Sequence, residues 1–112
     1  MPELCRAVRA GDFDAAFGLA ERDSLALLAA TMTGPEGWLY WAPTTLRLLE
    51  RTRELRAAAI PVYFSAAPGA TAYLNTTAAH VDAVREAAAE LGVETEVWRV
   101  GGPPRLTDDH LF

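Results

Sequence analysis

The sequence predicts an α+β fold, a ferredoxin-like two-layer sandwich in which helices cover a small antiparallel sheet. Apolar residues recur at helical spacing through most of the chain, and two β-prone runs, residues 62–66 and 70–75, flank a Pro-Gly turn. A third run, residues 93–100, alternates apolar and polar residues as a half-buried strand does. The predicted order is therefore helix, helix, strand, strand, helix, strand.

The first half of the chain is predicted to be helical. A short helix over residues 3–9 ends near Gly11, and Asp12 suits the N-cap of a longer helix because its carboxylate can accept first-turn amides. This helix extends to about Met32, and the segment 34–37, Gly-Pro-Glu-Gly, breaks it. Its apolar stripe comprises Phe13, Phe17, Ala20, Ser24, Leu27 and Leu28.

Pro43 suits the first position of the next helix, where its missing N–H is not needed. That helix extends to about Ala58, and its buried stripe comprises Leu46, Leu49, Thr52 and Leu55. The opposite side is charged and predicts a solvated face, formed by Arg47, Glu50, Arg51, Arg53, Glu54 and Arg56. The aromatic residues before the helix predict a segment in the core or in an interface: Trp38, Tyr40 and Trp41.

The second half begins with the hairpin and ends with a helix and the third strand. Pro61 opens the first strand, Thr77 suits the cap of the last helix, and Gly92 suits a left-handed stop after it. The apolar stripe of that helix comprises Val81, Val84, Ala88 and Leu91. The turn at residues 67–70 presents backbone and almost no side chain, so it serves either packing or the close approach of a ligand.

Composition excludes several classes of function. The chain has 112 residues, which suits one domain over residues 1–112, and its net charge of −5 gives no sign of a nucleic-acid partner. Cys5 is the only cysteine, which excludes an internal disulfide framework and favours a reducing compartment. No apolar run reaches the roughly 20 residues that span a bilayer, so no membrane partner is expected. We therefore expect a soluble, cytoplasmic protein.

The residues alone indicate no self-contained active site. His80 and His110 lack a supporting serine and acid, and one cysteine with two distant histidines gives no metal-ligand spacing. The common glycine-rich phosphate motifs do not occur. Asp23 and Ser24 interrupt an otherwise apolar helix, and two interpretations stay open: they face water, or they face a ligand pocket at the hairpin.

Several motifs occur in order between residues 12 and 91. ERDSLALLAA places Asp23 and Ser24 before Ala29, and TGPEGWLYW gives a proline-containing break and an aromatic segment. SAAPGA, residues 65–70, joins the two strands, and the tail adds the glycine- and proline-rich VGGPPR. This series resembles the C-terminal domain of mevalonate diphosphate decarboxylases, members of the GHMP kinase superfamily.

The resemblance implies a GHMP kinase C-terminal domain, on the substrate side of a diphosphomevalonate decarboxylase-like enzyme of isoprenoid biosynthesis, a carboxy-lyase. In that family the loop between the strands closes over the mevalonate part of the substrate. The resemblance therefore implies substrate-binding roles for Ser65, Ala66, Gly69, Asp23 and Ser24. The sequence departs from the family where Ser65 replaces the loop aspartate, Gly69 the loop asparagine and Leu28 a histidine. Ser65 cannot act as a carboxylate base.

The resemblance also implies partners. The family's ATP loop lies in an N-terminal domain that residues 1–112 do not include, so we expect no cofactor in this chain and ATP and Mg²⁺ only with that N-terminal half. The ligand is then a mevalonate-type phosphorylated small molecule, and the chain is inactive alone. One alternative is a free-standing binding or dimerisation module that forms a homo-oligomer through Trp38–Trp41. Another is a free-standing enzyme with Asp23 or Asp109 as base.

Overall fold

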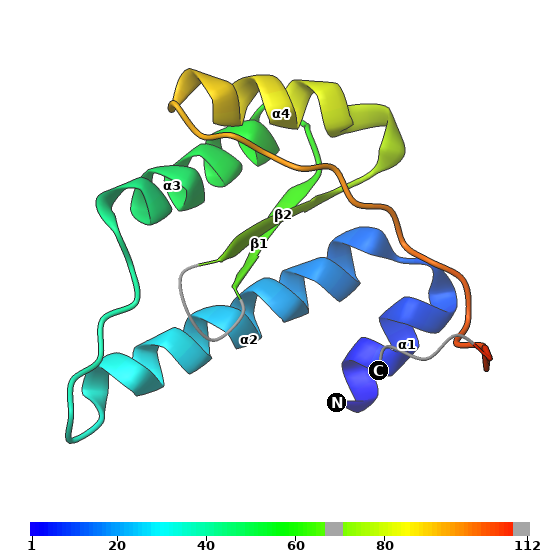
Figure 1. Ribbon diagram of the computed structural model, residues 1–112, viewed down its shortest axis with the longest axis horizontal. Coiled ribbons are helices and arrows are strands. Elements are labelled where there is room, and N and C mark those ends of the chain that lie inside the picture. Colours follow the sequence, from blue (N-terminus) through cyan, green and yellow to red (C-terminus); the bar gives the residue numbers. More distant parts are fainter. Residues whose placement is uncertain (67–70, 109–112) are drawn as a thin grey trace.

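Figure 1 shows the computed structural model, which describes residues 1–66 and 71–108 and has the predicted α+β architecture. A hairpin of two antiparallel strands lies between helix α2 and the neighbouring helices α3 and α4 (Figure 1). The elements in chain order are α1 (Pro2–Ala10), α2 (Phe13–Thr33), α3 (Pro43–Ala57), β1 (Val62–Ala66), β2 (Ala72–Thr76), the 3₁₀-helix η1 (Ala78–His80) and α4 (Val81–Glu90). In the described part of the chain, no helix is long and apolar enough to cross a bilayer.

Local signals set most element boundaries, and the predictions made from Gly11, Asp12, Pro43 and Gly92 are confirmed. Gly11 ends α1 with a φ of 68°, and Asp12 Oδ1 accepts the backbone N–H of Ala15 at 3.0 Å at the start of α2. Pro43 begins α3, and Gly92 follows α4 with a φ of 73°. The helix ends therefore follow from capping and from the conformational limits of glycine and proline.

The hairpin has two chemically different faces. Directly opposed residues of antiparallel strands point to the same face, and neighbouring residues on a strand point to opposite faces. One face is mostly apolar and consists of Val62, Phe64 and Ala66 with their cross-strand partners Thr76, Leu74 and Ala72. The other, which we call the Ser65 face, consists of Tyr63, Ser65, Tyr73 and Asn75.

The core lies on the apolar face of the hairpin. Phe64, which is 1% exposed, forms a buried cluster with Leu28 of α2 and Leu49 of α3. A second buried cluster joins the start of β1 to α3 and α4, through Leu55, Val62, Val84 and Ala87. Leu74 of β2 packs against both clusters, so the two strands and the three longer helices share one continuous apolar interior.

The third strand predicted at residues 93–100 is wrong. The described sheet contains only β1 and β2, and residues 93–100 run as an irregular segment past the hairpin (Figure 1). Trp98 is 74% exposed and Val100 is fully exposed. An alternating pattern forms a strand only where a neighbouring strand satisfies its backbone, and in the described residues this segment has none.

Some predicted side-chain environments are also wrong. Leu46 is 45% exposed while Leu48 is buried, because α3 packs against both β1 and α4 and so buries a broader side than one stripe. Leu27 of α2 is 47% exposed. Arg56 does not lie on a solvated face but bonds to the edge of β1. The Thr77 hydroxyl pairs with the His80 ring at 2.8 Å and makes no capping bond to the backbone.

Replacing Ala59 by glycine is expected to stabilise the protein. Ala59 follows α3 with a φ of 65°, while the N–H of Ile60 closes the helix end on the carbonyl of Leu55 at 2.9 Å. A left-handed alanine is strained, so Ala59→Gly should raise the free energy of unfolding by up to about 1 kcal/mol in urea unfolding. Ala58→Gly, at a φ of −88°, is the matched control and should not stabilise; equal gains from both would contradict the explanation.

Candidate functional site

Ser65 and Ala66, two of the predicted substrate-binding residues, end strand β1 on opposite faces of the hairpin. Ser65 is half-buried on the Ser65 face. Ala66 packs against the cluster that contains Phe64, so its side chain belongs to the core. Gly69 and Asp109 lie outside the described residues. The described part of this candidate site therefore centres on Ser65.

A polar network fixes the surroundings of Ser65. The side-chain amide of Asn75, on β2, donates to the backbone carbonyl of Tyr63 at 3.1 Å and to Ser65 Oγ at 2.9 Å. Asn75 lies directly opposite Tyr63 in the strand register, so its side chain reaches diagonally across the hairpin to Ser65. Sequence patterns do not reveal Asn75 as part of the site, because a polar residue in a predicted strand indicates an outward-pointing side chain but not which residue it contacts.

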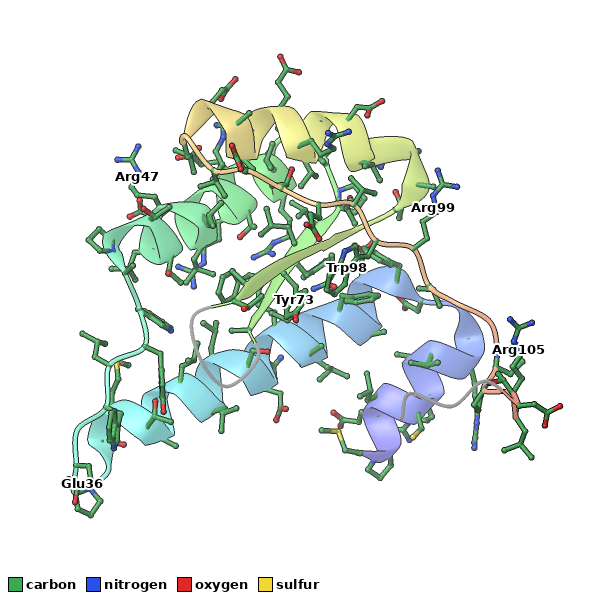
Figure 2. All side chains as sticks on the ribbon, in the orientation of Figure 1. Glu36, Arg47, Tyr73, Trp98, Arg99 and Arg105 are labelled. Carbon is green, nitrogen blue, oxygen red and sulfur yellow. The ribbon has the colours of Figure 1, made fainter. Side chains whose placement is uncertain are left out.

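Aromatic side chains frame this polar pair. Tyr73 opposes Ser65 in the register, and its ring lies 6.2 Å from the ring of Trp98, centroid to centroid. Figure 2 shows Tyr73 and Trp98 side by side, the first from β2 and the second from the segment that follows α4. Tyr63 stands on the other side of the Ser65 face and packs edge-on against Phe13 of α2. The Ser65 face thus combines a hydroxyl, an amide and two aromatic rings, and Trp98 lies beside one of these rings.

Tyr63 is held by contacts from both long helices. Its hydroxyl donates to Asp14 at 2.9 Å, and the Arg56 guanidinium lies 4.7 Å from its ring centre. Burial raises the pKa of Tyr63 above its ordinary value, and the hydrogen bond to Asp14 raises it further. The phenol therefore stays protonated to a higher pH in the folded chain than in the unfolded one.

The raised pKa of Tyr63 predicts a loss of stability in alkali. The stabilising contribution is fully present below the unfolded pKa of about 10 and is lost as the pH rises through the higher folded pKa. In urea unfolding measured between about pH 8 and pH 12, Tyr63→Phe should show a shallower alkaline fall than the wild-type chain. Tyr40→Phe, at an exposed position, is the control. Parallel pH profiles for wild type and Tyr63→Phe would contradict the prediction.

Asp23 and Ser24 lie on α2, where Asp23 is exposed and Ser24 is half-buried. In the described residues, no hydrogen bond joins either of them to Ser65 or Asn75. The α2 side chain that bonds to the backbone of the hairpin is Glu21, which is 7% exposed. The substrate-binding roles of Asp23 and Ser24 stay predictions.

Glu21 and Arg56 bind the free edge of β1. Glu21 Oε2 accepts the backbone N–H of Phe64 at 2.7 Å, and Arg56 donates to the backbone carbonyl of Val62 at 2.8 Å. The two side chains also pair through both guanidinium nitrogens, at 2.8 and 2.9 Å. Together they satisfy two of the backbone groups that a third strand would otherwise bind, the Phe64 N–H and the Val62 carbonyl. This pair fixes the strand that carries Ser65, and sequence reasoning missed it.

Other features of the described residues do not extend the site. They contain no group of three or more His, Cys, Asp or Glu side chains that could hold a metal ion. Two shallow hollows lie along α4 and between α3 and α4, and Ser65 lines neither. Trp41 packs in the core beside Ala66 and Ala72, and its buried Nε1 has no partner there.

A phosphomevalonate decarboxylase from Haloferax volcanii is 58% identical to this chain over 100 residues. The match covers 88% of this chain but 31% of the relative, so the chain spans about a third of that protein's length. No family model matches the chain.

Solved structures of mevalonate diphosphate decarboxylases share the fold. The enzyme from Enterococcus faecalis, in a structure that concerns mevalonate diphosphate-mediated ATP binding, matches with a TM-score of 0.74 at 22% identity. The enzyme from Staphylococcus aureus matches with a TM-score of 0.76 at 17% identity. Each match covers 80% of this chain and 28% or 27% of the solved chain.

Proposed function

Because this chain is homologous to about a third of a phosphomevalonate decarboxylase, we propose that it is the substrate-side domain of such an enzyme in isoprenoid biosynthesis. The observation that carries the proposal is the identity of 58% over 100 residues. The likeness to the mevalonate diphosphate decarboxylases, at 22% and 17% identity, supports the fold alone. The monophosphate is therefore the preferred substrate in the proposal, in place of the diphosphate that the resemblance implied.

The domain supplies one side of the site and depends on another part of the enzyme for ATP. Residues 1–112 contain none of the common phosphate-cradling loops, and the described residues offer no metal-binding group. ATP and Mg²⁺ accordingly belong to the N-terminal half in this proposal. Ser65, Ala66, Gly69, Asp23 and Ser24 keep the substrate-binding roles that the resemblance implies.

The test is a chimera. The matched 100 residues replace their counterpart in the Haloferax volcanii enzyme, and ATP-dependent release of carbon dioxide is measured with mevalonate 5-phosphate and with the diphosphate. The chimera should turn over the monophosphate in preference. This chain alone, and the Haloferax volcanii enzyme without its matched region, should release none. A folded but inactive chimera, or turnover by the chain alone, would overturn the proposal.

A second candidate function, a binding or dimerisation module, is favoured by exposed apolar side chains between α2 and α3. Trp38 is 60% exposed, Leu39 is 66% exposed, and the rings of Trp38 and Tyr40 stack at 6.3 Å. Trp41 does not belong to this surface, because it packs in the core. The test is sedimentation of the wild-type chain and of a Trp38→Ser, Leu39→Ser double variant over a range of concentrations. Association of the wild type that increases with concentration and that the variant loses would support the module. A wild-type chain that is monomeric at every concentration would exclude it.

A further inference from the structure

The backbone carbonyl of Tyr63 determines which end of the Asn75 side-chain amide is the nitrogen. The Tyr63 carbonyl oxygen can only accept a hydrogen bond, so the Asn75 atom 3.1 Å from it is the amide nitrogen. The same nitrogen lies 2.9 Å from Ser65 Oγ and donates its second hydrogen there. Ser65 Oγ is therefore an acceptor in this contact.

This contact determines what Ser65 can offer to a ligand. A serine hydroxyl has one O–H donor and two acceptor lone pairs, and Asn75 occupies one lone pair. In the described residues Ser65 Oγ has no other hydrogen-bond partner, so its O–H is free to donate. Both residues are half-buried on the Ser65 face, so neither is enclosed in the apolar core.

Resting on the proposed function, we propose that Asn75 is a positioning residue that holds Ser65 as a hydrogen-bond donor to an acceptor oxygen of the substrate. A carboxylate at position 65 could only accept from the substrate, whereas the held serine donates. Because hydrogen bonds to ionised acceptors are the stronger ones, the ligand oxygen we assign to it is an anionic one, of a carboxylate or of a phosphate. A phosphorylated mevalonate carries both groups.

Binding is measured on the 112-residue chain by NMR titration with mevalonate 5-phosphate. NMR detects millimolar affinities, so a chain that supplies only one side of the site still gives measurable shifts. Ser65→Ala and Asn75→Leu, which keeps the side-chain size but removes the amide, should each weaken binding about tenfold, as expected for a lost hydrogen bond to a charged oxygen. Thr44→Ala, at an exposed position on α3, should bind as wild type does.

The double variant tests whether Asn75 acts through Ser65. If it does, Ser65→Ala combined with Asn75→Leu binds no more weakly than Ser65→Ala alone. Additive losses would show an independent structural effect of Asn75 and would overturn this inference while leaving the proposed function intact. A wild-type chain that does not bind mevalonate 5-phosphate would overturn this inference, while the chimera decides the proposed function separately.

Two simpler probes identify the oxygen. Mevalonate has the carboxylate but no phosphate group. Inorganic phosphate has no carboxylate. A Ser65→Ala loss seen with mevalonate assigns the hydroxyl to the carboxylate, and a loss seen with phosphate assigns it to the phosphate; either supports the donor role. No loss with any of the three ligands would overturn it.

Discussion

Replacing Phe64 by alanine is expected to lower the free energy of unfolding by about 3–5 kcal/mol. Phe64 is 1% exposed and joins α2, α3 and β1 through its contacts with Leu28 and Leu49. Truncation removes the transfer energy of the ring and leaves a cavity that three separate elements border, so local collapse cannot fill it. A domain of this size is typically stable by 5–15 kcal/mol, so urea unfolding should show a large loss or an unfolded chain.

A matched control shows whether the loss of stability comes from the core position of Phe64 or from the removal of any apolar side chain. Leu27 lies on α2 next to Leu28 but is 47% exposed, and alanine is a good helix former. Leu27→Ala should therefore lower stability by less than about 1 kcal/mol. If Phe64→Ala does not fold, Phe64→Leu, which retains most of the side-chain volume, still allows the free energy of unfolding to be measured. Similar losses for Phe64→Ala and Leu27→Ala would contradict the position of the core.

The elements of this fold could be predicted from the sequence wherever their causes are local. Asp12 caps α2 and Gly11 ends α1 through contacts within a few residues, so their effects are visible in the sequence. The hairpin follows likewise from two β-prone runs and the turn between them. The prediction of a strand at 93–100 was wrong because alternating apolar and polar residues show which side chains would share a face, but not whether a partner strand is available.

The site was harder to predict because its polar contacts are distant in sequence. Glu21 and Arg56 are 35 residues apart, and helix periodicity assigns such charged residues to the solvent. Asn75 reaches Ser65 only because the register places it diagonally across the hairpin. Ser65 itself was found through a family resemblance, since a lone serine in a strand carries no signal of its own. The polar contacts of the site therefore become visible only when the positions of side chains on different helices and strands are known.

Replacing Arg56 by methionine is expected to cost about 3 kcal/mol, because it leaves the Glu21 carboxylate buried without its charged partner. Methionine retains much of the apolar stem, so the loss reports on the guanidinium rather than on packing. It also removes the donor to the Val62 carbonyl at the edge of β1. Urea unfolding gives the value. The matched control is Arg51→Met, since Arg51 pairs with the exposed Glu54 and Glu90, and its loss should be much smaller.

A double variant distinguishes a stranded charge from a broken strand edge. Glu21→Gln keeps an oxygen that can accept the Phe64 N–H but carries no charge. Glu21→Gln combined with Arg56→Met should therefore be more stable than Arg56→Met alone, since no unpaired charge stays buried. A double variant that is less stable than either single variant would show that the pair acts mainly through its bonds to β1. In that case the ion pair is a substitute for a missing strand and its charges are incidental.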